Sequence, residues 1–246
     1  MSTNRFQRWA IACLSVIAIT QPVWANPVVT DSRIIFNAPP PPTDQGAPRG
    51  RSQGGASRGS CEQYQELTAL VPTPEGRVWG LTASEHPTLW FYLPSALTAD
   101  VAIEFVLQDA TDQELYRTQF TSDTQPGLIR LAVPDTAPAM EPDKPYFWTL
   151  AIYCNPARPS ESVFVQGTVQ RLRLTPNQQR QFAAAAPLER SRLYAASGLW
   201  YDSLTMLADL RATDPAQAET AWLELLRQVG LEAVAEQPIA PCCTPQ

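Results

Sequence analysis

The sequence contains few residues whose types and spacing could support catalysis. His86 is the only histidine, and a general base needs a partner within hydrogen-bond reach. Its neighbour Glu85 would point to the opposite face of a strand, so the two side chains are not expected to meet. The favoured interpretation is therefore a histidine in a turn or at the surface.

Two further patterns share letters with known sites but lack their context. Residues 50–54 read GRSQG and match GxSxG, but a nucleophile elbow needs a strand before the serine and a helix after it. Asp109, Asp112 and Glu114 surround a turn without the spacing of a calcium loop, which favours a solvated turn. HExxH, the phosphate-binding loop and GxGxxG are absent from the sequence. We therefore predict no enzymatic activity and no cofactor.

Four cysteines follow the amino-terminal segment: Cys61, Cys154, Cys242 and Cys243. In an oxidising compartment they would form disulfides, and four cysteines allow three connectivities. We expect a Cys61–Cys154 bridge that ties the start of the folded region to its sheet. The adjacent pair would close a strained ring, so a bond to Cys61 or Cys154, a bond to another chain and a free thiol all stay open. Redox work by this pair is a third functional hypothesis.

Aromatic residues could stack on a sugar ring, but alternation along predicted strands favours core packing. This applies to Trp79, Trp90, Tyr92, Tyr146 and Trp148. As candidate binding aromatics we retain Trp79, Trp90, Trp200 and Tyr201. A metal site is disfavoured because the chain has one histidine and no CxxC.

The amino terminus has the parts of a secretory signal peptide in order. Arg5 and Arg8 precede the apolar run of residues 9–19, and VWA then supplies a cleavage site. The alternative is a membrane anchor, but the run is shorter than the roughly 18 residues that a span requires. We predict a signal peptide over residues 1–25 and an exported product, periplasmic or extracellular, with no integral membrane segment after cleavage.

The composition of the chain disfavours two classes of partner and predicts a linker. The formal net charge is −6 and Lys144 is the only lysine, which disfavours nucleic acid and anionic lipid as partners. Residues 26–60 are rich in Pro, Gly and Arg and contain too little apolar surface to fold. We predict a disordered, solvated linker. The alternative is a basic arm that contacts an acidic surface, peptidoglycan or its own domain.

Residues 61–174 predict short strands separated by turns. Residues 145–174 indicate a hairpin, because apolar residues alternate from Tyr146 to Ile152 and again after a Pro/Ser-rich turn. Five other stretches have similar patterns: 80–84, 88–93, 101–109, 114–120 and 128–133. About seven short strands with Pro and Gly turns favour an immunoglobulin-like antiparallel β-sandwich.

The hydrophobic period changes after Thr175. We predict helices over residues 177–186, 188–211 and 216–229, with Pro215 in the first turn of the last helix. Amphipathic helices joined by a short Pro turn favour a tetratricopeptide-like helical hairpin. It would occupy residues 175–232 and pack on the sandwich, and a tail would occupy residues 233–246.

The chain resembles a known family through several motifs. They are GSC at 59–61, LTALVP at 67–72, GLTASEHPTLWFYLP at 80–94, EFVLQD at 104–109, YFWTLAIYCNPARPS at 146–160, VQGTVQR at 165–171 and GLWYDSLTMLADLR at 198–211. Together they are similar to the exported cyanobacterial domain-of-unknown-function 928 family over residues 61–231. The resemblance implies a signal peptide, a Gly/Arg-rich leader, a β-domain and a helical tail. It implies no activity and no catalytic residues.

We therefore expect an exported cell-envelope protein that acts as a non-enzymatic protein-binding or scaffold module. Its partner would be an envelope protein. The alternative is a carbohydrate-binding or hydrolytic envelope protein that uses the candidate aromatics.

Overall fold

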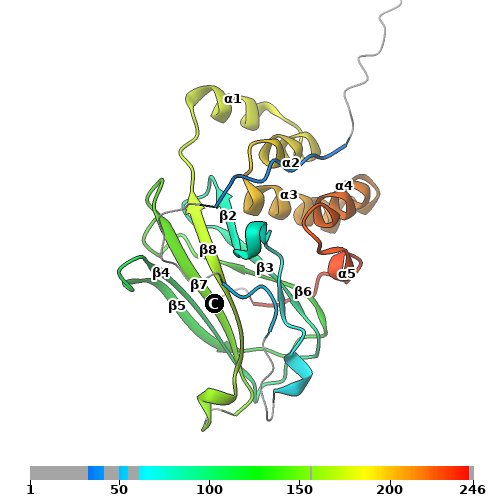
Figure 1. Cartoon of the computed structure of the whole chain (residues 1–246). Helices are drawn as coiled ribbons and strands as arrows, with labels where there is room; N and C mark the ends of the chain where they lie inside the picture. Colours follow the sequence, from blue (N-terminus) through cyan, green and yellow to red (C-terminus); the bar gives the residue numbers. More distant parts are fainter. Residues whose placement is uncertain (1–32, 42–49, 55–60, 156, 244–246) are drawn as a thin grey trace, which may run out of the picture. The chain divides into compact units, whose positions relative to one another are not determined.

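The computed structural model describes residues 33–41, 50–54, 61–155 and 157–243. The predicted signal peptide and parts of the predicted linker and tail lie outside the described residues. The described chain is a mixed α/β fold with eight strands in two sheets and five α-helices (Figure 1). None of the helices described is both long and apolar enough to cross a membrane.

The larger sheet has the strand order β2-β8-β7-β4-β5. Its strands are β2 (Trp79–Thr82), β4 (Ala102–Asp109), β5 (Glu114–Thr121), β7 (Pro145–Tyr153) and β8 (Val163–Arg171). The predicted hairpin is present, because β7 and β8 pair in antiparallel register. However, β2 pairs with β8 in parallel, so the prediction of a purely antiparallel fold is wrong at this edge. Alternation within one strand does not reveal the direction of a partner more than 80 residues away.

The smaller sheet has the order β1-β3-β6, formed by β1 (Thr68–Ala69), β3 (Thr88–Leu93) and β6 (Gly127–Ala132). Successive side chains of β3 point to opposite faces. Phe91 packs edge-on against Trp148 of the larger sheet, with ring centroids 5.6 Å apart. On the other face, Trp90 Nε1 donates a hydrogen bond to Thr205 of a helix. The smaller sheet therefore packs against the larger sheet on one face and against α3 on the other, and α3 also contacts the larger sheet directly through Tyr201 and Trp148.

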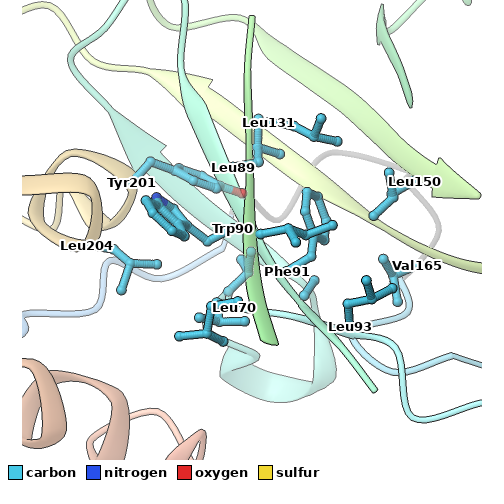
Figure 2. Close-up of a cluster of buried hydrophobic side chains, with 14 of the residues drawn as sticks. Leu70, Leu89, Trp90, Phe91, Leu93, Leu131, Leu150, Val165, Tyr201 and Leu204 are labelled. Atoms are coloured by element: carbon cyan, nitrogen blue, oxygen red, sulfur yellow. The ribbon is translucent and has the colours of Figure 1, made fainter. Parts of the chain in front are cut away.

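One apolar core joins the sheets and the helices. Figure 2 shows Tyr201 and Leu204 on one side of this cluster and Leu150 and Val165 on the other. Burying an apolar side chain of this size contributes about 1.5–3 kcal/mol, and edge-to-face aromatic contacts add to that. This core is the main source of stability in the described fold.

Five α-helices follow the strands: α1 (Pro176–Ala184), α2 (Pro187–Ala196), α3 (Trp200–Thr213), α4 (Pro215–Arg227) and α5 (Glu232–Ala235). The prediction of one helix over residues 188–211 is wrong. Gly198 has a φ of +76°, a left-handed conformation that ends a helix and that glycine adopts at little cost. The turn at Gly198 separates α2 from α3, and Trp200 and Tyr201 at the start of α3 pack into the core. The region is therefore a run of shorter packed helices and not the predicted single hairpin.

Two segments of the predicted linker lie against this fold. Ile34 is fully buried, and the main-chain N–H of Asn37 donates to the Ala195 carbonyl at the end of α2. Arg51 forms an isolated bridge with Gln166 of β8, and Gln53 forms one with Thr68 of β1. The predicted solvated linker therefore does not describe residues 33–41 and 50–54, because a buried isoleucine and main-chain pairing hold them.

Candidate functional site

The four candidate binding aromatics are buried, with exposed fractions of 5% for Trp79, 1% for Trp90, 0% for Trp200 and 1% for Tyr201. Their polar atoms also have partners. Trp200 Nε1 donates to the Leu70 carbonyl at 2.8 Å, and Tyr201 Oη accepts from Trp148 Nε1 at 3.1 Å. These residues therefore offer no aromatic face on which a sugar could stack, and core packing explains them.

The cysteines form two disulfides of different kinds. Cys61 is bonded to Cys154, 93 residues away, as expected for a bridge that ties the entering chain to the sheet. Cys242 and Cys243 are bonded to each other. This second bond joins neighbours in the chain, a pairing that the strained-ring argument disfavoured.

His86 lies in the connection between β2 and β3, and its ring is engaged by two groups. Its Nε2 lies 2.9 Å from the Ala137 carbonyl, which requires an N–H donor there, and Nδ1 lies 3.5 Å from Asp135. Ser84 Oγ donates to the His86 main-chain carbonyl rather than to the ring. Glu85 instead pairs with Arg171 at 2.7 Å. The arrangement positions a turn and does not present a general base to a nucleophile.

The other two motif matches also have structural roles. Asp109 Oδ1 accepts hydrogen bonds from the Thr111 amide and hydroxyl, which lower the pKa of this carboxyl. Glu114 forms an ion pair with Arg117. Within the described residues, no three His, Cys, Asp or Glu side chains gather as metal ligands. Ser52 lies between Arg51 and Gln53, which both form isolated β-bridges, so the described residues 50–54 do not have the strand-to-helix turn of a nucleophile elbow.

A groove of about 810 Å³ lies where α3, the smaller sheet and residues 239–243 meet. One wall is the carboxyl-terminal segment, which runs parallel to β6: the Leu128 amide donates to the Pro238 carbonyl and the Ala240 amide donates to the Leu128 carbonyl. The groove is lined by Trp90, Arg130, Ala208, Asp209, Ala212, Thr213, Ile239, Ala240, Pro241, Cys242 and Cys243. Its volume is in the range of ligand sites.

The walls of this groove are mainly aliphatic, and one ion pair crosses from sheet to helix. Arg130 Nη1 of β6 donates to Asp209 Oδ1 of α3 at 3.0 Å, with both side chains about half exposed. Ala212 on the same helix is exposed. The adjacent cysteines lie at one boundary, with Cys242 Sγ 3.6 Å from Ser122 Oγ. A few polar groups on an apolar surface are typical of a binding site.

A second cavity of about 180 Å³ shares Asp209 with the groove and is more polar. It is lined by Thr82, Ser84, His86, Thr88, Tyr194, Tyr201, Asp202, Thr205, Met206 and Asp209. Asp202, in the first turn of α3, accepts from the Ala83 amide at 2.9 Å and from the Thr82 hydroxyl. Burial raises the pKa of Asp202 to about 6, because these hydrogen bonds only partly offset the lost solvation.

Sequence reasoning did not identify Asp202, Asp209 or Arg130. An acidic residue in the first turn of a helix is ordinary, since it favours the helix dipole. Arg130 and Asp209 are 79 positions apart, and only the packing of β6 near α3 brings them together. Trp90, Cys242 and Cys243 were retained as candidates, and the structure brings these three to the groove.

The comparisons with known proteins agree with the motifs. No curated protein matches the sequence. A family model described as Domain of Unknown Function (DUF928) matches residues 53–239, which include every strand and α-helix described above. The chain therefore belongs to the DUF928 family.

Proposed function

We propose that this chain is an exported, non-enzymatic binding module of the cell envelope that holds a segment of a partner protein in the groove. The observation that supports this proposal is the groove itself, about 810 Å³ with aliphatic walls and a single ion pair. Such a surface suits apolar side chains of a partner, with Arg130 and Asp209 placed to fix orientation through polar contacts.

Export is supported by the order of charges and apolar residues at the amino terminus. The long-range Cys61–Cys154 bond is consistent with it, because structural disulfides persist in oxidising compartments. The test is fractionation of cells that produce the full chain, followed by amino-terminal sequencing of the protein. We expect an exported product that begins at Asn26, and a cytoplasmic, uncleaved product would contradict the proposal.

A protein partner is favoured over a carbohydrate by the nature of the walls. Sugar recognition by stacking needs an exposed aromatic face, whereas Trp90 contributes to the groove with only 1% of its surface exposed. Alanine, proline and isoleucine side chains supply the rest of the apolar surface. We therefore expect no binding on a glycan array, and reproducible binding there would revive the carbohydrate alternative.

Site-specific photocrosslinking tests the groove directly. A photoreactive residue at Ala212, which is exposed and lines the groove, should give one reproducible protein adduct in cells. The matched control is the same substitution at Gln119, which is exposed on the edge strand β5 outside the groove. Equal adducts from both positions, or none from Ala212, would argue against the groove as the binding surface.

The origin of the chain and its more distant structural relationships are also proposals. We propose a cyanobacterial origin, supported by the family resemblance of the motifs. We propose a distant relation to immunoglobulin-like sandwiches, supported by two packed sheets. We also propose one to tetratricopeptide hairpins, supported by α3 and α4, which Asp214 alone connects. Comparison with an experimental structure of this chain would test both relations.

A further inference from the structure

The smaller cavity contains a carboxylate without a cationic partner. Asp202 is partly buried, and its hydrogen bonds come from the Ala83 amide and the Thr82 hydroxyl. No Lys, Arg or His of the described residues forms an ion pair with it, although ten such pairs occur elsewhere in the described chain. A buried charge is costly unless it is paired. The hydrogen bonds to Asp202 therefore come from neutral donors, and its charge has no cation beside it among the described residues.

The surroundings of Asp202 suit a small organic cation. Thr88 and Thr205 line the cavity with hydroxyl groups, and Asp209 adds a second carboxylate at the side shared with the groove. Tyr194 supplies an aromatic ring and Met206 a thioether. Hydroxyl and carboxylate oxygens accept hydrogen bonds from an ammonium group, whose charge is also attracted to an aromatic ring. Met206 can contact methylene groups.

We propose that this cavity binds a primary ammonium group carried on a short alkyl chain. The volume of about 180 Å³ corresponds to about six water molecules in the liquid, which is enough for a butylammonium-sized ligand. Asp202 receives the ammonium, Tyr194 and Met206 cover its alkyl chain, and Asp209 adds to the negative potential. The site adjoins the groove through Asp209, and its ligand is a different one from the proposed protein partner.

The ligand set disfavours an inorganic cation. Calcium takes 6–8 oxygen ligands and magnesium requires an octahedral arrangement, whereas the described residues bring together no three candidate metal ligands. One oxygen of Asp202 is also occupied by the Ala83 amide. An ammonium group needs only two or three acceptors, which this cavity provides.

Ammonium binding should depend on pH through the groups that line the cavity. Protonation of Asp202 removes the attracting charge, and the His86 imidazole lines the same cavity. Tyr194 and Tyr201 stay neutral because burial raises the pKa of both phenols. Asp209 is paired with Arg130, so its charge is partly compensated. Binding is therefore expected to weaken as the pH falls from 7.5 to 5.

The test is titration of the full chain with n-butylammonium, followed by NMR at the Ala83 amide, which donates directly to Asp202. Wild type should show saturable shifts at pH 7.5, and n-butanol should produce none. Asp202→Asn should raise the Kd about tenfold or more, the effect of losing a charge-assisted hydrogen bond. Asp100→Asn, which removes an exposed carboxylate outside the cavity, should bind like wild type.

Four results would overturn the proposal. The first three are the absence of saturable binding to wild type, equal binding of n-butanol, and an unchanged Kd in Asp202→Asn. The fourth is a stronger shift with calcium chloride than with n-butylammonium, which would assign an inorganic site. His86→Gln should keep the loss of binding at low pH, which separates the Asp202 carboxylate from the imidazole. Circular dichroism of each variant shows whether it is folded.

Discussion

Two adjacent residues of α3 serve regions with different requirements. The Tyr201 hydroxyl lies in the core, where it accepts from Trp148 Nε1 at 3.1 Å and lies 3.4 Å from the Thr168 carbonyl, to which it donates. Asp202 faces the smaller cavity and has no cationic partner among the described residues. The core therefore satisfies its polar groups internally, whereas the cavity keeps a charge available. A charge retained at a cost in stability is a common property of functional sites.

The largest loss of stability is expected from a substitution in the core. Trp148→Ala removes a buried ring that contacts Phe91, and it leaves the Tyr201 hydroxyl without its donor. We expect a loss of about 3–5 kcal/mol in the free energy of unfolding, measured by urea denaturation. A loss below about 1 kcal/mol would show that the core can repack around the deletion, which would weaken the contrast with the cavity.

The two disulfides should differ in their contribution to stability. Cys61→Ser with Cys154→Ser opens a bridge between residues 93 apart, and we expect it to cost about 2–5 kcal/mol. Cys242→Ser with Cys243→Ser opens a bond between neighbours and should cost less than about 1 kcal/mol, because little chain entropy is involved. Thermal unfolding of both double variants makes the comparison, and equal losses would contradict it.

Gly127→Ala should loosen the carboxyl-terminal wall of the groove. Gly127 has a φ of +150°, and an added Cβ would lie 2.5 Å from the Pro238 carbonyl oxygen. We expect the free energy of unfolding to fall by about 1–3 kcal/mol. We also expect faster hydrogen exchange at the Ala240 main-chain amide, which donates to the Leu128 carbonyl. Unchanged exchange at Ala240 would mean that the segment adapts without leaving β6.

Asp202→Asn should stabilise the protein at neutral pH. The pKa of Asp202 is about 6 in the folded protein, above its ordinary value of 3.8, so the folded state binds the proton more tightly than the unfolded state. Stability from this group is therefore greatest below about pH 4, falls as the pH rises to about 6, and stays low above it. Removing the charge should raise the unfolding free energy at pH 8 by about 1 kcal/mol, allowing for screening at a partly exposed group.

Urea denaturation of wild type and Asp202→Asn at pH 4 and pH 8 measures this difference. We expect the two proteins to converge at the lower pH, because Asp202 is then protonated in the wild type. A variant that is less stable at pH 8 would mean that the carboxylate holds α3 to β2 through Ala83 rather than being kept for a ligand.

The smallest expected effect is on the exposed ion pair. Arg130→Ala removes the contact between β6 and Asp209, and both side chains are about half exposed. We expect a stability change of about 0–1 kcal/mol together with a clear loss of crosslinking from Ala212. Intact crosslinking would indicate that only the apolar walls of the groove contribute to binding.

The sequence predicted the local elements well where the hydrophobic period was strong. β7 and β8 form the predicted hairpin, and the stretches predicted over 88–93 and 216–229 match β3 and α4 closely. Strand β1 was missed because its two residues are too short for a period. The boundary at Gly198 was missed because a single glycine inside an apolar helical pattern can be tolerated, and its conformation depends on packing.

The sequence by itself showed which apolar residues share one face of a strand or helix. This is because the side-chain periods of 2.0 and 3.6 residues follow from backbone geometry alone. The sequence by itself also gave the positions of the cysteines and the signal-peptide pattern at the amino terminus. Only the tertiary structure decided that β2 runs parallel to β8, that Trp200 is buried, and that Asp202 has no cationic partner among the described residues. The physical reason is that these properties depend on contacts between distant segments, and a local pattern contains no information about which segments meet.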